Sequence, residues 1–116
     1  MDAARRAVQH ILDRHEPWPA VAFDRHWDMV LSNRMVTPLL TGVDPALLQA
    51  PVNLLRVSLH PGGLATRIVN LNQWREHLFA RLQQQIRATA DDGLADLLAE
   101  LQAYPGQTPD ATARLD

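Results

Sequence analysis

The strongest local pattern in the chain begins near Asn70, where apolar residues recur every three or four positions. Arginine and glutamine take the outer positions, an arrangement typical of a helix with one face against a core. Asn70 and Gln73 have the spacing of a capping box, in which each side chain satisfies a backbone N–H of the first turn. The apolar face of this predicted helix comprises Leu71, Trp74, Leu78, Leu82 and Ile86.

A second amphipathic helix is predicted from about Asp92 to Ala103, with Asp91 or Asp92 as its cap. Because only residues 88–91 separate the two helices, we expect them to be antiparallel neighbours. The apolar face of the second helix comprises Leu94, Leu97, Leu98 and Leu101.

The beginning of the chain predicts one helix and a hairpin. Asp2 can cap a helix that runs to about Glu16, and Pro17 ends it because proline disfavours helical geometry in the residue before it. Two apolar runs, 19–23 and 27–31, flank a short polar connection and predict two strands. Alternation in the second run places Trp27, Met29 and Leu31 on one face. The connection has no glycine, so we expect it to be looser than a tight primed turn.

Three polar residues predict short helical segments in the middle of the chain. Asn33 is the predicted cap of a helix over 34–40, and Asp44 followed by Pro45 opens another helical turn. Asn53 can cap residues 54–59, whose pattern fits a helix or a strand equally well. The predicted fold class is therefore α+β, predominantly helical, with a two-stranded N-terminal hairpin and several helices.

Length, charge and composition exclude several classes of protein. A chain of 116 residues fits one domain with a modest core, and the absence of cysteine excludes disulfides and thiolate metal sites. A formal net charge of −2 gives no general attraction to nucleic acid or anionic lipid. No stretch approaches the ~20 apolar residues that a membrane span needs, and the first residues lack the apolar core of a signal peptide. We therefore expect a cytoplasmic protein without a membrane anchor.

No residue pattern points to catalysis, a metal or a cofactor. His10 and His15 lie on different faces of the predicted first helix, and the other histidines belong to separate elements. Asp24 and Asp28 flank the hairpin connection, where turn chemistry explains them better than acid–base catalysis does. We therefore expect that the chain is not an enzyme. No pair of short helices carries a basic recognition face, so we also expect no direct binding of nucleic acid by this chain alone.

A set of large apolar residues can line either a core or a pocket. Arg56 and Arg67 can meet an anionic head group of a ligand near that set, or they can pair with Glu76 or face water. The apolar set comprises Trp27, Met29, Leu39, Leu55, Trp74, Leu78 and Phe79.

Several linked motifs between residues 14 and 105 resemble one protein family. They are the run from Pro17 to Asp28 with Ser32-Asn33-Arg34, the stretch Asn53-Leu54-Leu55-Arg56, the run from His60 to Asn70, Trp74-Arg75 with His77-Leu78, and residues 94–101 leading to Tyr104-Pro105. In this order they are similar to the MmyB-like ligand-binding domain of bacterial helix-turn-helix transcription regulators.

The resemblance implies a PAS-like sensor domain that binds a small hydrophobic or fatty-acid-like ligand and relays its presence to DNA binding. The expected ligand-binding residues are Trp27, Met29, Leu55, Arg67, Asn70, Trp74 and Leu78. Alternatively, the same apolar surface serves protein–protein association, or the chain is a non-functional remnant of a regulator gene.

The chain departs from the family pattern at both ends. Members carry a helix-turn-helix domain before this region and continue past the Tyr-Pro position into further strands. We therefore expect residues 1–105 to form an incomplete domain and residues 106–116 to be a flexible tail. A lone two-stranded hairpin has unpaired edges, which predicts either an incompletely covered pocket or a homodimer through the hairpin edge.

Overall fold

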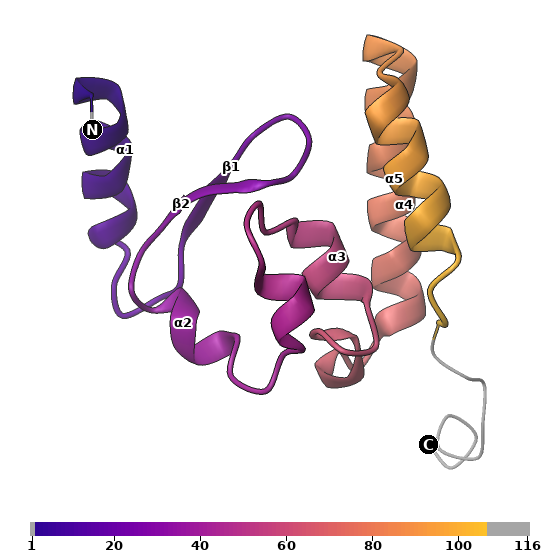
Figure 1. Cartoon of the computed structure of the whole chain (residues 1–116), viewed down its shortest axis with the longest axis horizontal. Helices are drawn as coiled ribbons and strands as arrows, with labels where there is room; N and C mark the ends of the chain where they lie inside the picture. Colours follow the sequence, from indigo (N-terminus) through magenta and orange to yellow (C-terminus); the bar gives the residue numbers. More distant parts are fainter. Residues whose placement is uncertain (1, 107–116) are drawn as a thin grey trace.

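The computed structural model describes residues 2–106 (Figure 1). This part of the chain is α+β and predominantly helical, as the sequence predicts. The predicted tail over 106–116 lies outside the described residues, except for Gly106. The elements in chain order are α1 (Ala3–Asp13), β1 (Val21–Phe23), β2 (Met29–Ser32), α2 (Val36–Leu39), the 3₁₀-helix η1 (Pro45–Leu48), α3 (Leu54–Leu59), the 3₁₀-helix η2 (Ala65–Arg67), α4 (Leu71–Thr89) and α5 (Asp92–Gln102).

The core lies where α3 packs against the α4–α5 pair. Helices α4 and α5 lie side by side at one end of the molecule, as predicted from their short link (Figure 1). One leucine from each of the three helices, Leu59, Leu82 and Leu101, is completely shielded from solvent. The buried core cluster comprises Leu55, Leu59, Ala65, Leu71, Leu78, Leu82, Leu94, Leu97 and Leu101.

Helices α4 and α5 differ in how their N-terminal ends are capped. Asp91 caps α5 as predicted, because its carboxylate accepts hydrogen bonds from the N–H groups of Gly93 and Leu94. The predicted capping box at Asn70 is wrong. The Asn70 side chain caps no backbone group of α4, and its amide instead donates to Oε1 of Gln73 at 3.3 Å. Its backbone (φ −107°, ψ 51°) is not the extended conformation that a capping side chain needs.

The hairpin is shorter than the sequence predicts. Strands β1 and β2 pair antiparallel, with Ala22 opposite Leu31 and a bulge between Ala22 and Phe23. Trp27 lies outside β2 with a φ of 72°, so it does not share the alternation of Met29 and Leu31, and that prediction is wrong. The cause is the Asp24 carboxylate, which accepts from the N–H groups of His26 and Asp28 and extends the turn to Asp28. The connection is thus looser than a primed turn, as expected.

A segment from the middle of the chain lies beside the start of β2. The N–H of Met29 donates to the carbonyl of Val52 at 2.7 Å, and the N–H of Leu54 donates to the carbonyl of Trp27 at 2.8 Å. Asn53 is buried between them and forms a bridge with Asp28. Its side chain also accepts from the N–H groups of the first turn of α3, so residues 54–59 are a capped helix.

Asn33 fastens α1 and the loop after it to the hairpin. It is only 2% exposed, and its amide donates to the carbonyls of Leu12 (2.8 Å) and Trp18 (2.9 Å). Its side-chain oxygen accepts from the N–H groups of Ala20 and Met35. The prediction that Asn33 caps a helix over 34–40 is therefore wrong, since α2 begins at Val36 and Asn33 is used to join separate segments.

Candidate functional site

A groove lies where the hairpin connection faces α3 and α4. It consists of two adjoining cavities that share Phe23, Trp27, His77 and Arg81 as lining. The smaller cavity is called the inner cavity because the buried core residues Leu55 and Leu78 line it. It has a volume of about 250 Å³ and is also lined by Leu54, Ser58 and Trp74. The outer cavity has a volume of about 680 Å³ and is also lined by Asp24, Arg25, Gln84, Gln85 and Ala88. Together they offer the space that small-molecule sites use in proteins.

Two aromatic pairs line the inner cavity from different elements. On the hairpin, the rings of Phe23 and Trp27 stack with centroids 4.8 Å apart and planes 12° apart. On α4, the rings of Trp74 and His77 stack with centroids 5.8 Å apart and planes 26° apart. Phe23 is 46% exposed and Trp74 is 40% exposed, so both keep ring surface that a ligand can cover. Trp74 is therefore not part of the core face predicted for its helix.

Gln85 holds Trp27 in place from α4. The indole Nε1–H of Trp27 donates to Oε1 of Gln85 at 2.9 Å, and Nε2 of Gln85 donates to the carbonyl of Arg25 at 2.7 Å. One glutamine thus binds a side chain and a backbone group of the same turn. These bonds fix the orientation of the indole ring, and Trp27 lines both cavities of the groove.

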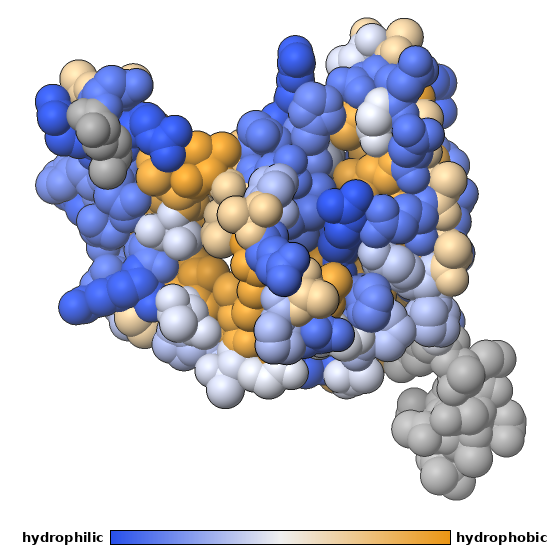
Figure 2. Space-filling model, viewed as in Figure 1, coloured by the Kyte–Doolittle hydropathy of each residue, from blue (hydrophilic) through white to orange (hydrophobic). Residues whose placement is uncertain are grey.

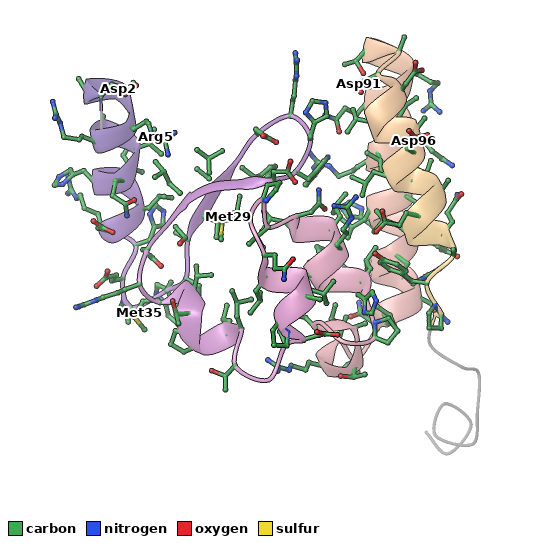
Figure 3. The ribbon with its side chains drawn as sticks, in the orientation of Figure 1. Asp2, Arg5, Met29, Met35, Asp91 and Asp96 are labelled. Atoms are coloured by element: carbon green, nitrogen blue, oxygen red, sulfur yellow. The ribbon has the colours of Figure 1, made fainter. Side chains whose placement is uncertain are left out.

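His26 makes a second link between the hairpin connection and the helices. Its Nε2 lies 2.8 Å from a carboxylate oxygen of Asp91, the residue that caps α5. The hydrogen bond from His26 lowers the pKa of Asp91. Figure 3 shows Asp91 at the end of the α4–α5 pair that reaches the hairpin connection. The wall of the groove that the hairpin provides is therefore attached to α4 and to the start of α5.

Some arginines of the described chain are paired with an acidic side chain, and others have no partner for the guanidinium group. Arg56 donates two hydrogen bonds to the carboxylate of Glu100, at 2.7 and 2.9 Å, and this pairing lowers the pKa of Glu100 and raises that of Arg56. The Tyr104 hydroxyl donates to the same carboxylate, and burial raises the pKa of Tyr104 to about 12. Within residues 2–106, Arg25 and Arg81 have no hydrogen-bond or ion-pair partner for their guanidinium groups. Both of them line the groove.

The structure brings four of the seven predicted ligand-binding residues together in the groove: Trp27, Leu55, Trp74 and Leu78. The other three lie elsewhere. Met29 is on β2, well away from α4 (Figure 3). Arg67 donates to the carbonyls of Leu39 and Thr41, and Asn70 bonds to Gln73.

Ten lining residues of the groove were not predicted from the sequence: Phe23, Asp24, Arg25, Leu54, Ser58, His77, Arg81, Gln84, Gln85 and Ala88. A signal for five of them exists on α4, where positions 74, 77, 81, 84/85 and 88 recur every three or four residues. They form a second face beside the core face of the same helix. Neither Arg56 nor Arg67, the two arginines proposed to meet a ligand, lines this groove.

The acidic side chains near the groove are used in the fold. Asp24 accepts from two backbone N–H groups of its own turn, and Asp28 accepts from the amide of Asn53. In residues 2–106 no group of three or more histidine and acidic side chains is placed to hold a metal ion. None of the described helices is both long and apolar enough to cross a membrane.

One comparison with known proteins identifies a family. The family model described as MmyB-like transcription regulator ligand binding domain matches residues 4–116, nearly the whole chain. No curated protein and no solved structure matches the chain.

Proposed function

The chain belongs to the family of MmyB-like transcription regulator ligand-binding domains, and from this membership we propose that its groove senses a small hydrophobic molecule. The observation that carries the proposal is the inner cavity, where aromatic side chains from the hairpin and from α4 meet apolar side chains of α3. A fatty-acid-like molecule belongs to the proposed ligand class. Its apolar part would cover the exposed ring surface of Phe23 and Trp74, and burial of that surface favours binding.

The links around the groove support a role in signalling. Any ligand that moves the hairpin connection changes two hydrogen bonds that leave it. One joins Trp27 to Gln85 on α4, and the other joins His26 to Asp91 at the start of α5. Occupancy of the groove can therefore change the position of the hairpin relative to two helices. This is the kind of two-position element through which a binding site affects a distant surface.

Further parts of the proposal concern the location of the chain, its arrangement and the activities that it lacks. We propose that it acts in the cytoplasm, has a PAS-like arrangement, catalyses no reaction, uses no cofactor and does not bind nucleic acid alone. The net charge of −2 supports the absence of nucleic-acid binding, and the use of Asp24 and Asp28 in turn and bridge contacts supports the absence of acid–base catalysis by these two residues.

Native mass spectrometry of the gently purified protein tests the proposal. We expect a co-purified hydrophobic compound that is retained by Trp18→Ala and lost by Trp74→Ala. Trp18 is the matched control because it is 72% exposed and lines neither cavity of the groove. A spectrum without any bound compound, from a protein that also binds none of a panel of hydrophobic acids and alcohols, would contradict the proposal.

A second candidate function is association with another protein, including a second copy through the hairpin edge. Figure 2 shows hydrophobic surface exposed between α1 and the hairpin. The exposed large apolar side chains of these elements are Val8, Ile11, Phe23 and Val30. Light scattering after size exclusion separates the two functions: a stoichiometric dimer with an empty groove favours association, and a monomer with a bound compound favours sensing.

A further inference from the structure

We infer that the groove prefers a planar aromatic molecule with one anionic group over a flexible alkyl acid. This inference rests on the proposed function and narrows the ligand class of the same groove. Two features carry it: the aromatic pairs that line the inner cavity, and an arginine that lines both cavities without a partner in the described part of the chain.

Aromatic side chains from two separate elements of the fold line the inner cavity. The Phe23–Trp27 pair comes from the hairpin, with ring planes 12° apart, and the Trp74–His77 pair comes from α4, with ring planes 26° apart. Aromatic rings attract one another in offset-stacked and edge-to-face arrangements beyond the effect of area alone. An alkyl chain gains only the free energy of burying its apolar surface area. A planar ring system therefore uses more of what these side chains offer.

The position of Trp27 strengthens this preference. Its indole N–H is held by Gln85, so the ring does not need to be ordered when a ligand binds. A fixed ring suits a rigid planar ligand, because neither partner loses much conformational freedom on binding. A flexible chain must lose rotational freedom of its own to lie against the same surface.

The charge around the groove selects an anion at its outer side. Arg81 lines both cavities, Arg25 lines the outer one, and within residues 2–106 neither guanidinium has an acidic partner. One carboxylate, Asp24, lines the outer cavity, and it already accepts two backbone hydrogen bonds. Two cations against one anion leave this region positive. A carboxylate on the ligand can accept two parallel hydrogen bonds from a guanidinium.

The arrangement assigns a place to each part of the ligand. The ring system lies in the inner cavity of about 250 Å³, against Trp74 and Trp27. The anionic group lies at Arg81, where the two cavities meet. Arg81 is then the residue that determines the preference for a charged ligand over a neutral one.

Isothermal titration of the full chain with three probes tests the inference. The probes are naphthoate (aromatic, anionic), naphthalenemethanol (aromatic, neutral) and decanoate (alkyl, anionic). We expect naphthoate to bind about tenfold more tightly than either of the others. We expect Arg81→Gln to weaken naphthoate about tenfold and to leave naphthalenemethanol unchanged. The matched control is Arg87→Gln, on the same helix but outside the groove, which should change neither.

Several outcomes would overturn the inference. If decanoate binds more tightly than naphthoate, the aromatic preference is wrong while the proposed sensing function stands. Equal affinity for naphthoate and naphthalenemethanol, or an equal loss in the Arg81 and Arg87 variants, would refute the role of Arg81. Arg81 is exposed and unpaired within residues 2–106, so its variant should melt at the same temperature as the parent, which shows that the fold is intact. If none of the three probes binds and no compound co-purifies, the proposed function fails as well.

Discussion

Replacing Asn33 by alanine should destabilise the protein far more than a change at the next residue. Asn33 joins the end of α1, the loop after it, the start of β1 and the start of α2 through four hydrogen bonds. The alanine variant keeps the backbone but removes all four of these hydrogen bonds. The loss should loosen α1 from the hairpin.

The loss in the free energy of unfolding depends on which of these backbone groups keeps another hydrogen-bond partner. The Trp18 carbonyl accepts only from Asn33 among residues 2–106, so the variant leaves it unpaired at a cost of about 1–3 kcal/mol. The Leu12 carbonyl still accepts from the N–H of His15. Each of the other three hydrogen bonds contributes about 0.5–1.5 kcal/mol, less where water replaces Asn33. We expect a total loss of about 3 kcal/mol in the free energy of unfolding, since such contributions are not additive.

Urea denaturation measures this loss. At an m value of about 1.5 kcal/mol/M, the unfolding midpoint should fall by about 2 M. The matched control is Arg34→Ala, which removes only an ion pair to Glu16 from a side chain that is 82% exposed, and it should cost less than about 1 kcal/mol. A midpoint for Asn33→Ala within error of that control would refute the assignment of Asn33 as the residue that joins these segments.

Two further predictions concern the helices. Leu82→Ala should cost about 3 kcal/mol because Leu82 is fully shielded, whereas Trp74→Ala should cost only about half as much because that ring is 40% exposed; equal losses in thermal melts would show that Trp74 is packed inside. Glu100→Gln should remove a stabilisation that depends on pH. The hydrogen bond from Arg56 lowers the pKa of folded Glu100, so the stabilisation is present above the unfolded value of about 4.3 and is lost as pH falls through the lower folded value. The melting temperatures of parent and variant should thus differ near pH 7 and converge well below pH 4, and a constant difference would contradict the pairing.

The parts of the fold that the sequence predicts are those encoded by neighbouring residues. Helices α4 and α5 have regular apolar spacing, and Asp91 and Asn53 cap the residues that directly follow them. Local hydrogen bonds of this kind depend on a few adjacent positions. The length of the hairpin connection was harder to predict, because the Asp24 side chain extends a turn that alternation alone assigns to a strand.

The parts that could not be predicted depend on distant residues. Asn33 has the residue type of a helix cap, and its actual partners lie up to 21 positions away. The segment that joins the start of β2 does so through backbone groups of Val52 and Leu54, which have no sequence signature. These contacts are fixed only when the whole chain packs.

The residues of the groove also divide into those that the local sequence predicts and those that depend on distant partners. Large apolar residues such as Leu55 and Leu78 are evident as lining or core from their type alone. The sequence does not show which arginines line the groove, because this depends on which of them pair with an acidic side chain in the fold. Arg56 meets Glu100, 44 positions later, whereas Arg81 on an amphipathic helix has the appearance of an ordinary solvated residue.

The most direct test of the groove uses the indole N–H signals of the three tryptophans in a ¹⁵N-labelled sample. Trp27 and Trp74 line the inner cavity, and Trp18 does not. Titration with any compound that binds, naphthoate first, should shift the Trp27 and Trp74 signals and leave the Trp18 signal in place. A bound compound that shifts the Trp18 signal and leaves the other two unchanged would show that the binding site lies elsewhere on the molecule.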